Sequence, residues 1–133
     1  MPYLVDSDIV IDHFANVKEA TELLETLASE GIAISIITYM ETYQGVIRSP
    51  HLDLAQSKFE TFLTSVPILP FSLSVAKRCA QLRETLKKEN KRVNARALDL
   101  MTATIALEND LTLVTRNVED YKDIPDLLLY PLY

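Results

Sequence analysis

The chain has 133 residues, of which 48% are hydrophobic and only one, Cys79, is a cysteine. This length and apolar content suit one globular domain, so we expect a single domain over residues 1–133. One cysteine excludes an internal disulfide and a cysteine-based zinc cluster within the chain. The net charge of −6 means that a polyanionic substrate would need a local basic patch or bound cations.

We expect no secretory signal, because Met1-Pro2 is followed by only three apolar residues before Asp6. The longest uncharged stretch, residues 61–76, is interrupted by two prolines and is shorter than the ~20 apolar residues that span a bilayer. We therefore expect a cytoplasmic protein that does not enter a membrane.

A short apolar run over residues 3–5 opens the chain and ends abruptly on Asp6-Ser7-Asp8. The run predicts a buried strand whose final polar residues lie at the C-terminal edge of an α/β sheet, where ligand sites form. Asp6 has two interpretations at this point, a cap for the following helix or a functional carboxylate. A short helix through Phe14 is expected next, and Asn16 is expected to cap a second helix that stops at Gly31.

The second strand is predicted over residues 32–37, which are apolar on both faces, as in a central parallel strand. It leads into a helix that starts with Thr38 and Glu41 at the spacing of a capping box. Taken singly, Glu41 is therefore explained better as a cap than as a functional acid. Ser49-Pro50 predicts the start of another helix, and the proline-bracketed run 66–70 predicts a short strand at a sheet edge.

The second half of the chain continues the alternation of helices and strands. A long helix from Ser72 or Ser74 carries Cys79 on its apolar stripe, and residues 97–107 predict a helix that is apolar almost all round. Residues 111–115 predict a buried strand and residues 127–130 a final short one. The pattern predicts an α/β fold, an α/β/α sandwich with a mostly parallel central sheet of four or five strands.

Asp99 interrupts the predicted apolar helix. An isolated carboxylate in such a position costs several kcal/mol unless it is compensated. In a parallel sheet, Asp6, Glu41, Asp99 and Asp120 would share one edge, although Asp120 and Asn117 could instead form an Asx-type turn. Converging carboxylates require bound protons or cations, and all-oxygen ligands favour Mg²⁺ or Mn²⁺. His13 and His51 have no visible partner, and we assign them no catalytic role.

Four segments resemble the successive motifs of PIN-domain ribonucleases, specifically the VapC-type toxins of bacterial and archaeal toxin–antitoxin pairs. The segments are residues 4–12, residues 35–41 with Gly45, residues 99–106 and residues 113–121, and the likeness covers nearly the whole chain. The resemblance implies a PIN-like fold in which Asp6, Glu41 and Asp99 bind the metal and Asp120 is a further catalytic acid. Ser7, Thr38, Thr115 and Asn117 would support the site, with Asn117 the alternative to Asp120 as its fourth member.

The resemblance also implies the activity and the partners. The chain would be a Mg²⁺- or Mn²⁺-dependent endoribonuclease, the toxin of a type II pair, which hydrolyses RNA phosphodiester bonds. A cognate antitoxin protein would block it, and it would form a homodimer. Where the family often has glycine before the last motif strand, this chain has Asn109-Asp110, and asparagine can adopt the left-handed conformation there.

A basic segment precedes the Asp99 helix. It could grip RNA phosphates, or it could be a solvated helix end that complements the macrodipole. The possible RNA-binding residues are Lys87, Lys88, Lys91, Arg92 and Arg96, with Arg116 from the last motif.

Two other functions compete with the ribonuclease. In a haloacid-dehalogenase-like phosphatase, Asp6 would be a covalent nucleophile and Asp8 a general acid, but the chain shows no convincing lysine motif or late aspartate pair, and Asp99 would be unexplained. A non-catalytic PIN-like module would only bind a protein partner, and the complete set of acids argues against it.

Overall fold

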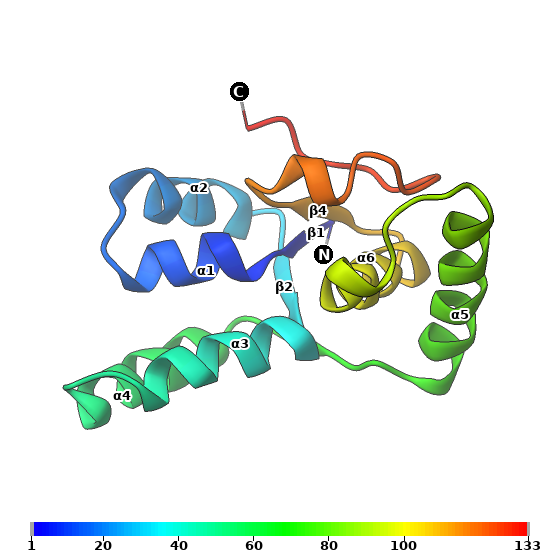
Figure 1. Ribbon diagram of the computed structural model, residues 1–133. Helices are drawn as coiled ribbons and strands as arrows, with labels where there is room; N and C mark the ends of the chain where they lie inside the picture. Colours follow the sequence, from blue (N-terminus) through cyan, green and yellow to red (C-terminus); the bar gives the residue numbers. More distant parts are fainter. Residues whose placement is uncertain (1, 133) are drawn as a thin grey trace.

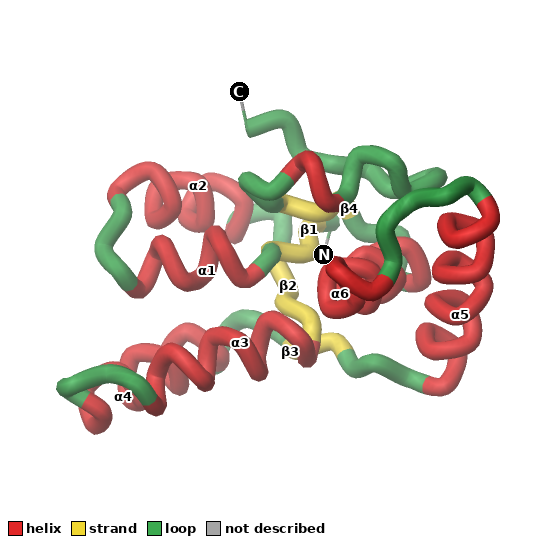
Figure 2. Tube along the Cα trace, in the orientation of Figure 1, coloured by secondary structure: helices red, strands yellow, loops and turns green. Residues whose placement is uncertain are grey.

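The computed structural model describes residues 2–132 and shows a four-stranded, all-parallel sheet with helices on both faces (Figure 1, Figure 2). The predicted α/β class is confirmed. The strands are β1 (Tyr3–Val5), β2 (Ile32–Ser35), β3 (Ile68–Leu69) and β4 (Thr112–Val114), in the order β3-β2-β1-β4. The expected final strand at 127–130 is reduced to one bridge between Leu113 and Leu129.

Six α-helices connect and cover the strands. In Figure 1, α1, α2 and the hairpin of α3 and α4 lie on one side of the strands, and α5 and α6 lie on the other. Among residues 2–132, no helix is both long enough and apolar enough to cross a bilayer. The helices are α1 (Ser7–Phe14), α2 (Lys18–Ala28), α3 (Ile36–Ile47), α4 (Leu52–Leu63), α5 (Leu73–Lys88) and α6 (Ala97–Glu108), with single-turn 3-10 helices η1 (Asn94–Arg96) and η2 (Val118–Asp120).

Successive residues of the central strands face different helices, because side chains alternate along a strand. Leu4 and Leu113 belong to a core with α5 and α6, which includes Cys79 as predicted. Val5 and Val114 belong to a second core with α1 and α2. The sheet is therefore buried on both faces, which explains why its strands read as uninterrupted apolar runs.

The register brings the ends of β1 and β4 together. Val5 pairs with Val114, and the backbone N–H of Asp6 donates to the Val114 carbonyl oxygen at 2.9 Å. Asp6 and Thr115 therefore leave the sheet side by side, at the edge where β2 also ends. This is the edge at which the sequence predicts a site.

Two predicted helix caps are wrong. Asn16 adopts a left-handed conformation (φ 64°) that turns the chain out of α1, so Val17 caps α2 instead. The Ser35 hydroxyl accepts the backbone N–H of Thr38 at 3.0 Å, so Ser35 ends β2 two residues early and caps α3 in place of Thr38. Glu41 is consequently not part of a capping box.

Two further local expectations need correction. Ser49 does not cap α4; its hydroxyl accepts the backbone N–H of His51, and α4 begins at Leu52. At the end of α6, Asp110 rather than Asn109 takes the left-handed conformation (φ 54°). The turn after α6 still forms where it was expected, because an aspartate, like an asparagine, tolerates the left-handed region.

Candidate active site

Asp6 is a buried carboxylate, 5% exposed, at the end of the central strand β1. Its Oδ1 accepts the backbone N–H of Ser7 at 2.8 Å, so it caps α1. Its Oδ2 accepts the hydroxyls of Thr115 and Tyr121, both at 2.9 Å. The two interpretations of Asp6 are thus compatible, because one oxygen caps a helix while the other faces the predicted site.

Tyr121 joins Asp6 to Asp99. The phenol oxygen lies 2.9 Å from Asp6 Oδ2 and 3.1 Å from Asp99 Oδ1, and the residue is 1% exposed. Asp99 comes from the first turn of α6, and Tyr121 directly follows η2. Two of the three acids predicted to bind metal therefore meet at one phenol. Tyr121 was not among the predicted site residues, because no helical or strand periodicity marks it.

Glu41 and Asp120 are close enough to this pair for their charges to act on Asp99. The Ser7 hydroxyl donates to Glu41 Oε1 at 2.9 Å. Asn117 Nδ2 donates to Asp120 Oδ2 at 2.7 Å, and Arg92 donates to Asp120 Oδ1 at 2.6 Å. The structure therefore brings the four predicted acids to one region through contacts made by neighbouring polar side chains.

Asp8 also lies at this site, although it was not among the predicted ribonuclease residues. Its Oδ2 accepts the backbone N–H of Arg116 at 2.9 Å and lies 3.3 Å from the Thr115 hydroxyl. Its Oδ1 is buried and has no hydrogen-bond partner among residues 2–132. The sequence Asp6-Ser7-Asp8 could have indicated that Asp8 belongs to the site, since two acids that are two residues apart at a strand end can reach the same sheet edge.

Thr38 lies outside the cluster of acids. It is fully buried, and its hydroxyl and backbone N–H contact the Ser35 hydroxyl. Ser35 Oγ lies 3.4 Å from Thr102 on α6, which links α3 to that helix. Thr38 can therefore support the site only by fixing the start of the helix that carries Glu41.

Burial and mutual repulsion act on the acids of the site. Burial raises the pKa of Asp6, Asp8 and Asp99 above the usual range, and hydrogen bonds from Ser7, Tyr121 and Arg116 partly oppose this. The negative charges of Asp120 and Glu41 further raise the pKa of Asp99. The site is therefore costly to ionise completely without a cation.

Asp120 differs from the other acids. Its hydrogen bonds from Arg92 and Asn117 lower its pKa. It therefore stays ionised under conditions that favour a proton on its neighbours.

The donor atoms of this cluster fit a hard divalent cation. They are all oxygens, and Asp6, Glu41 and Asp99 each contact a hydroxyl group. A bound cation would relieve the repulsion between these acids. Within residues 2–132, no group of three histidine, cysteine or acidic side chains is already arranged to hold a metal ion. The side chains would therefore have to rotate or shift when an ion binds. Asp6 and Asp99 both contact the Tyr121 phenol, and both would have to reach the same ion.

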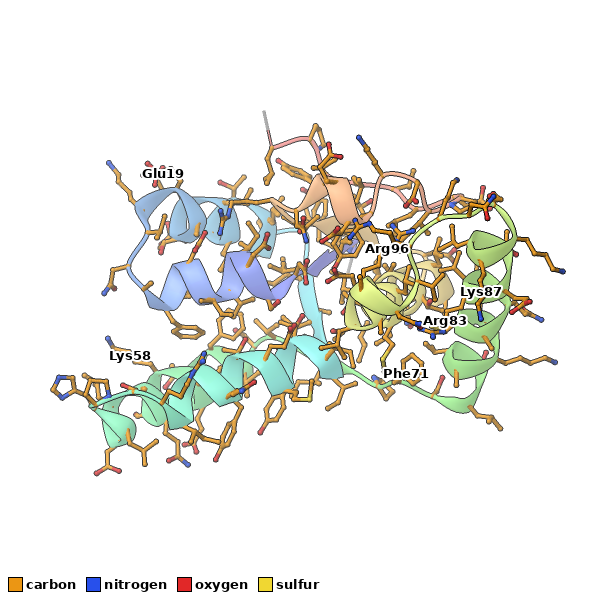
Figure 3. All side chains as sticks on the ribbon, in the orientation of Figure 1. Glu19, Lys58, Phe71, Arg83, Lys87 and Arg96 are labelled. Atoms are coloured by element: carbon orange, nitrogen blue, oxygen red, sulfur yellow. The ribbon has the colours of Figure 1, made fainter. Side chains whose placement is uncertain are left out.

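The predicted RNA-binding residues are not equivalent. Lys87 and Lys88 are exposed at the end of α5, where Figure 3 shows Lys87 apart from Arg96 at the start of α6. Lys91 pairs with Glu89 at 3.5 Å. Arg92 and Arg116 are exposed; the guanidinium of Arg92 pairs with Asp120, and Arg116 pairs with Asp12 while its backbone N–H donates to Asp8.

Arg96 is not available to RNA, which corrects its inclusion in that set. It is 3% exposed, and its guanidinium binds both oxygens of Asp123 at 2.5 and 2.8 Å. It also donates to the backbone carbonyl oxygens of Arg92 and Asp120. Arg96 therefore fixes the turn that carries Asp120 and Tyr121.

Replacing Arg96 should destabilise the fold strongly. Arg96→Met would leave Asp123 and two carbonyl oxygens without their donor, and each buried polar group that loses its partner costs about 1–3 kcal/mol. Arg78→Met is the matched control, because the ion pair of Arg78 with Glu108 is half-exposed and should contribute about 1 kcal/mol or less. Urea unfolding of both variants measures the difference, and equal losses would contradict a structural role for Arg96.

Comparison with known proteins gives a consistent set of similarities. Residues 3–127 match the family described as PIN domain. Ribonuclease VapC2 of Rickettsia felis is 33% identical over 133 residues, which is 97% of this chain and 96% of that protein. The structure of VapBC2 from Rickettsia felis, bound to a DNA fragment from their promoter, contains a chain with a TM-score of 0.86, 31% identity and 98% coverage of both chains. A chain of a toxin-antitoxin complex from Klebsiella pneumoniae gives a TM-score of 0.77, 29% identity and 98% coverage of both.

Proposed function

Because the chain belongs to the PIN-domain family, and within it to the VapC ribonucleases, we propose that it is a metal-dependent endoribonuclease and the toxin of a type II toxin–antitoxin pair. The family indicated by the four sequence motifs is confirmed by a similarity that spans the chain. One observation supports the site assignment most directly. Asp6 and Asp99, 93 positions apart in the sequence, meet at a single phenol oxygen at the C-terminal edge of the sheet.

Asp6, Asp99 and Glu41 are the residues that would hold Mg²⁺ or Mn²⁺ in this proposal. Such an ion, when bound, stabilises negative charge on the phosphate and lowers the pKa of water. The other polar residues position these acids: Thr115 donates to Asp6 and Ser7 donates to Glu41. Oxygen-only ligands do not distinguish Mg²⁺ from Mn²⁺.

We assign the fourth acidic position to Asp120 rather than Asn117. The charge of Asp120 acts on Asp99, whereas the side chain of Asn117 reaches the site through its hydrogen bond to Asp120. Arg92 and Asn117 keep Asp120 ionised, which suits a group that must accept a hydrogen bond from water or substrate at the open side of the site.

RNA would reach the site past exposed arginines. Arg92 and Arg116 are the basic residues that lie beside the acids, so we propose that they contact phosphates next to the cleaved bond. Lys87, Lys88 and Lys91 would contribute more weakly, since they lie at the end of α5 and just after it, and Lys91 pairs with Glu89 rather than with an acid of the site. Together with bound cations, these residues offset the net charge of −6.

The proposal includes protein partners. The similar structures are toxin–antitoxin complexes, so we propose that a cognate antitoxin protein inhibits this chain and that the toxin is a homodimer in the cytoplasm. Exposed apolar side chains on α3, namely Ile36, Met40 and Ile47, offer surface for such contacts. Residues 1–133 would act as one domain, because all four strands belong to one sheet.

The first test incubates the purified chain, freed of any partner, with structured RNAs and with a chromogenic phosphate ester. RNA cleavage is expected with Mg²⁺ or Mn²⁺, to disappear with EDTA and to return when excess metal is added. Ester turnover without RNA cleavage would favour the phosphatase, and a covalent aspartyl-phosphate at Asp6 would establish it. If neither substrate reacts while metal binding is confirmed, the chain is a binding module.

A further inference from the structure

Tyr121 carries a polar group where the core requires only an aromatic ring. The ring is fully buried in the core that contains Leu4, Leu100 and Leu113. A phenylalanine would fill the same space, and burying a hydroxyl costs free energy unless it is hydrogen-bonded. Among residues 2–132, the hydroxyl bonds only to the carboxylates of Asp6 and Asp99. The hydroxyl therefore has a function that the packing of the ring does not explain.

The hydroxyl occupies the one point that the two carboxylates share. A phenol has a single proton, so it can donate fully to only one carboxylate at a time. Asp6 Oδ2 already accepts the Thr115 hydroxyl as well, whereas Tyr121 provides the only hydroxyl within hydrogen-bond distance of Asp99 among residues 2–132. The phenol thus sets the position of Asp99 relative to Asp6.

Backbone hydrogen bonds fix the position of Tyr121. The backbone N–H of Tyr121 donates to the Val118 carbonyl oxygen at 3.0 Å. The preceding carbonyl, that of Asp120, accepts from Arg96, which is buried in its ion pair with Asp123. Asp99 is half-buried in the first turn of α6 and less constrained, so the rigid partner in this contact is Tyr121.

We propose that the Tyr121 hydroxyl is a positioning group that orients Asp6 and Asp99 for a shared divalent cation. This inference rests on the proposed metal-dependent function. Hydrogen-bond donors to metal-binding carboxylates restrict the rotation of the ligands before the ion arrives, and their loss weakens metal binding about 10- to 100-fold. Tyr121 acts through the two acids and needs no contact with the RNA.

The test replaces the hydroxyl and keeps the ring. Tyr121→Phe is expected to weaken Mn²⁺ binding, measured by electron paramagnetic resonance, by about 10-fold or more. The metal concentration that gives half-maximal RNA cleavage should rise by a similar factor, while kcat at saturating metal changes much less. A general structural defect would instead lower kcat even at saturating metal concentration.

Tyr130→Phe is the matched control, because it makes the same chemical change in a tyrosine that packs against Tyr3. Equal Mn²⁺ affinity of Tyr121→Phe and the wild type, or tighter binding by the variant, would overturn the role of Tyr121 alone. Absence of Mn²⁺ binding by the wild type would overturn the metal-dependent function as well. If Tyr121→Phe does not fold, NMR of wild-type protein with ¹³C-labelled tyrosine decides: Mg²⁺ must shift the resonance of the buried phenol, and no shift would overturn the proposal.

Discussion

Asp99→Asn is expected to abolish RNA cleavage and, at the same time, to stabilise the metal-free protein. The carboxylate charge contributes several kcal/mol to cation binding and hence to transition-state stabilisation, which corresponds to a loss of about 1,000-fold or more in kcat/KM. In the metal-free fold the same charge is unfavourable, because burial and the neighbouring acids raise the pKa of Asp99. Removing it should add up to about 1 kcal/mol of stability, kept small because water screens this half-exposed group.

The control for this substitution is Asp110→Asn, just beyond the same helix. Asp110 is exposed and left-handed (φ 54°), a conformation that asparagine adopts readily, so neither activity nor stability should change much. Cleavage rates with Mg²⁺ and thermal unfolding with EDTA measure the two effects. Retained cleavage by Asp99→Asn would remove Asp99 from the site, and a loss of both activity and metal-free stability would indicate a structural role.

The arrangement of strands could be predicted because hydrophobic periodicity reports burial on both faces of the sheet. Residues 3–5 and the run starting at Ile32 are apolar without alternation, and the structure buries them from both sides. The prolines around residues 68–69 correctly placed β3 at an edge. The last segment, 127–130, has the same composition but pairs only through Leu129, because strand pairing depends on the position of the partner.

Helix caps were predicted less well, because several residues near each helix start can serve as the cap. Ser35 and Thr38 both carry hydroxyls, and local sequence does not show which of them leaves the strand first. In the structure the cap of α3 is Ser35, which lies at the end of β2 and also contacts Thr102 of α6. This choice matters for function, since it releases Glu41 from a capping role and lets it bond with Ser7.

The reason given for Asp99 from the sequence, burial of a carboxylate, was correct but incomplete. Asp99 lies in the first turn of α6, where a helix tolerates an acid, and it is only half-buried. Burial is the main reason why its charge is unfavourable, and the proximity of other acids, which depends on tertiary structure, adds to it. Tyr121 and the burial of Arg96 were missed for the same reason, because both depend on contacts across more than 20 positions of sequence.

The metal-free protein is expected to become less stable as the pH rises from about 4 to about 8. Asp6, Asp8 and Asp99 have pKa values raised above the ordinary value of 3.8, mainly by burial. Such acids stabilise the fold fully below the unfolded pKa, and this contribution is lost as the pH rises through the folded pKa. Asp120 and Asp123 have lowered pKa values, so their contribution is lost only below about pH 4, outside this range.

Mg²⁺ should reverse this trend, because it binds ionised carboxylates and its stabilisation therefore grows with pH. At a free concentration about 100 times its dissociation constant it would add about 2.7 kcal/mol, or about 10 °C in Tm. Burial lowers the pKa of His13, which opposes the acids in the same pH range, so the wild type is compared with Asp99→Asn, in which His13 is unchanged. Thermal unfolding at about pH 5 and about pH 8, with EDTA or Mg²⁺, gives the result. An Mg²⁺ shift that is equal in both proteins, or equal at both pH values, would mean that the ion does not bind these acids.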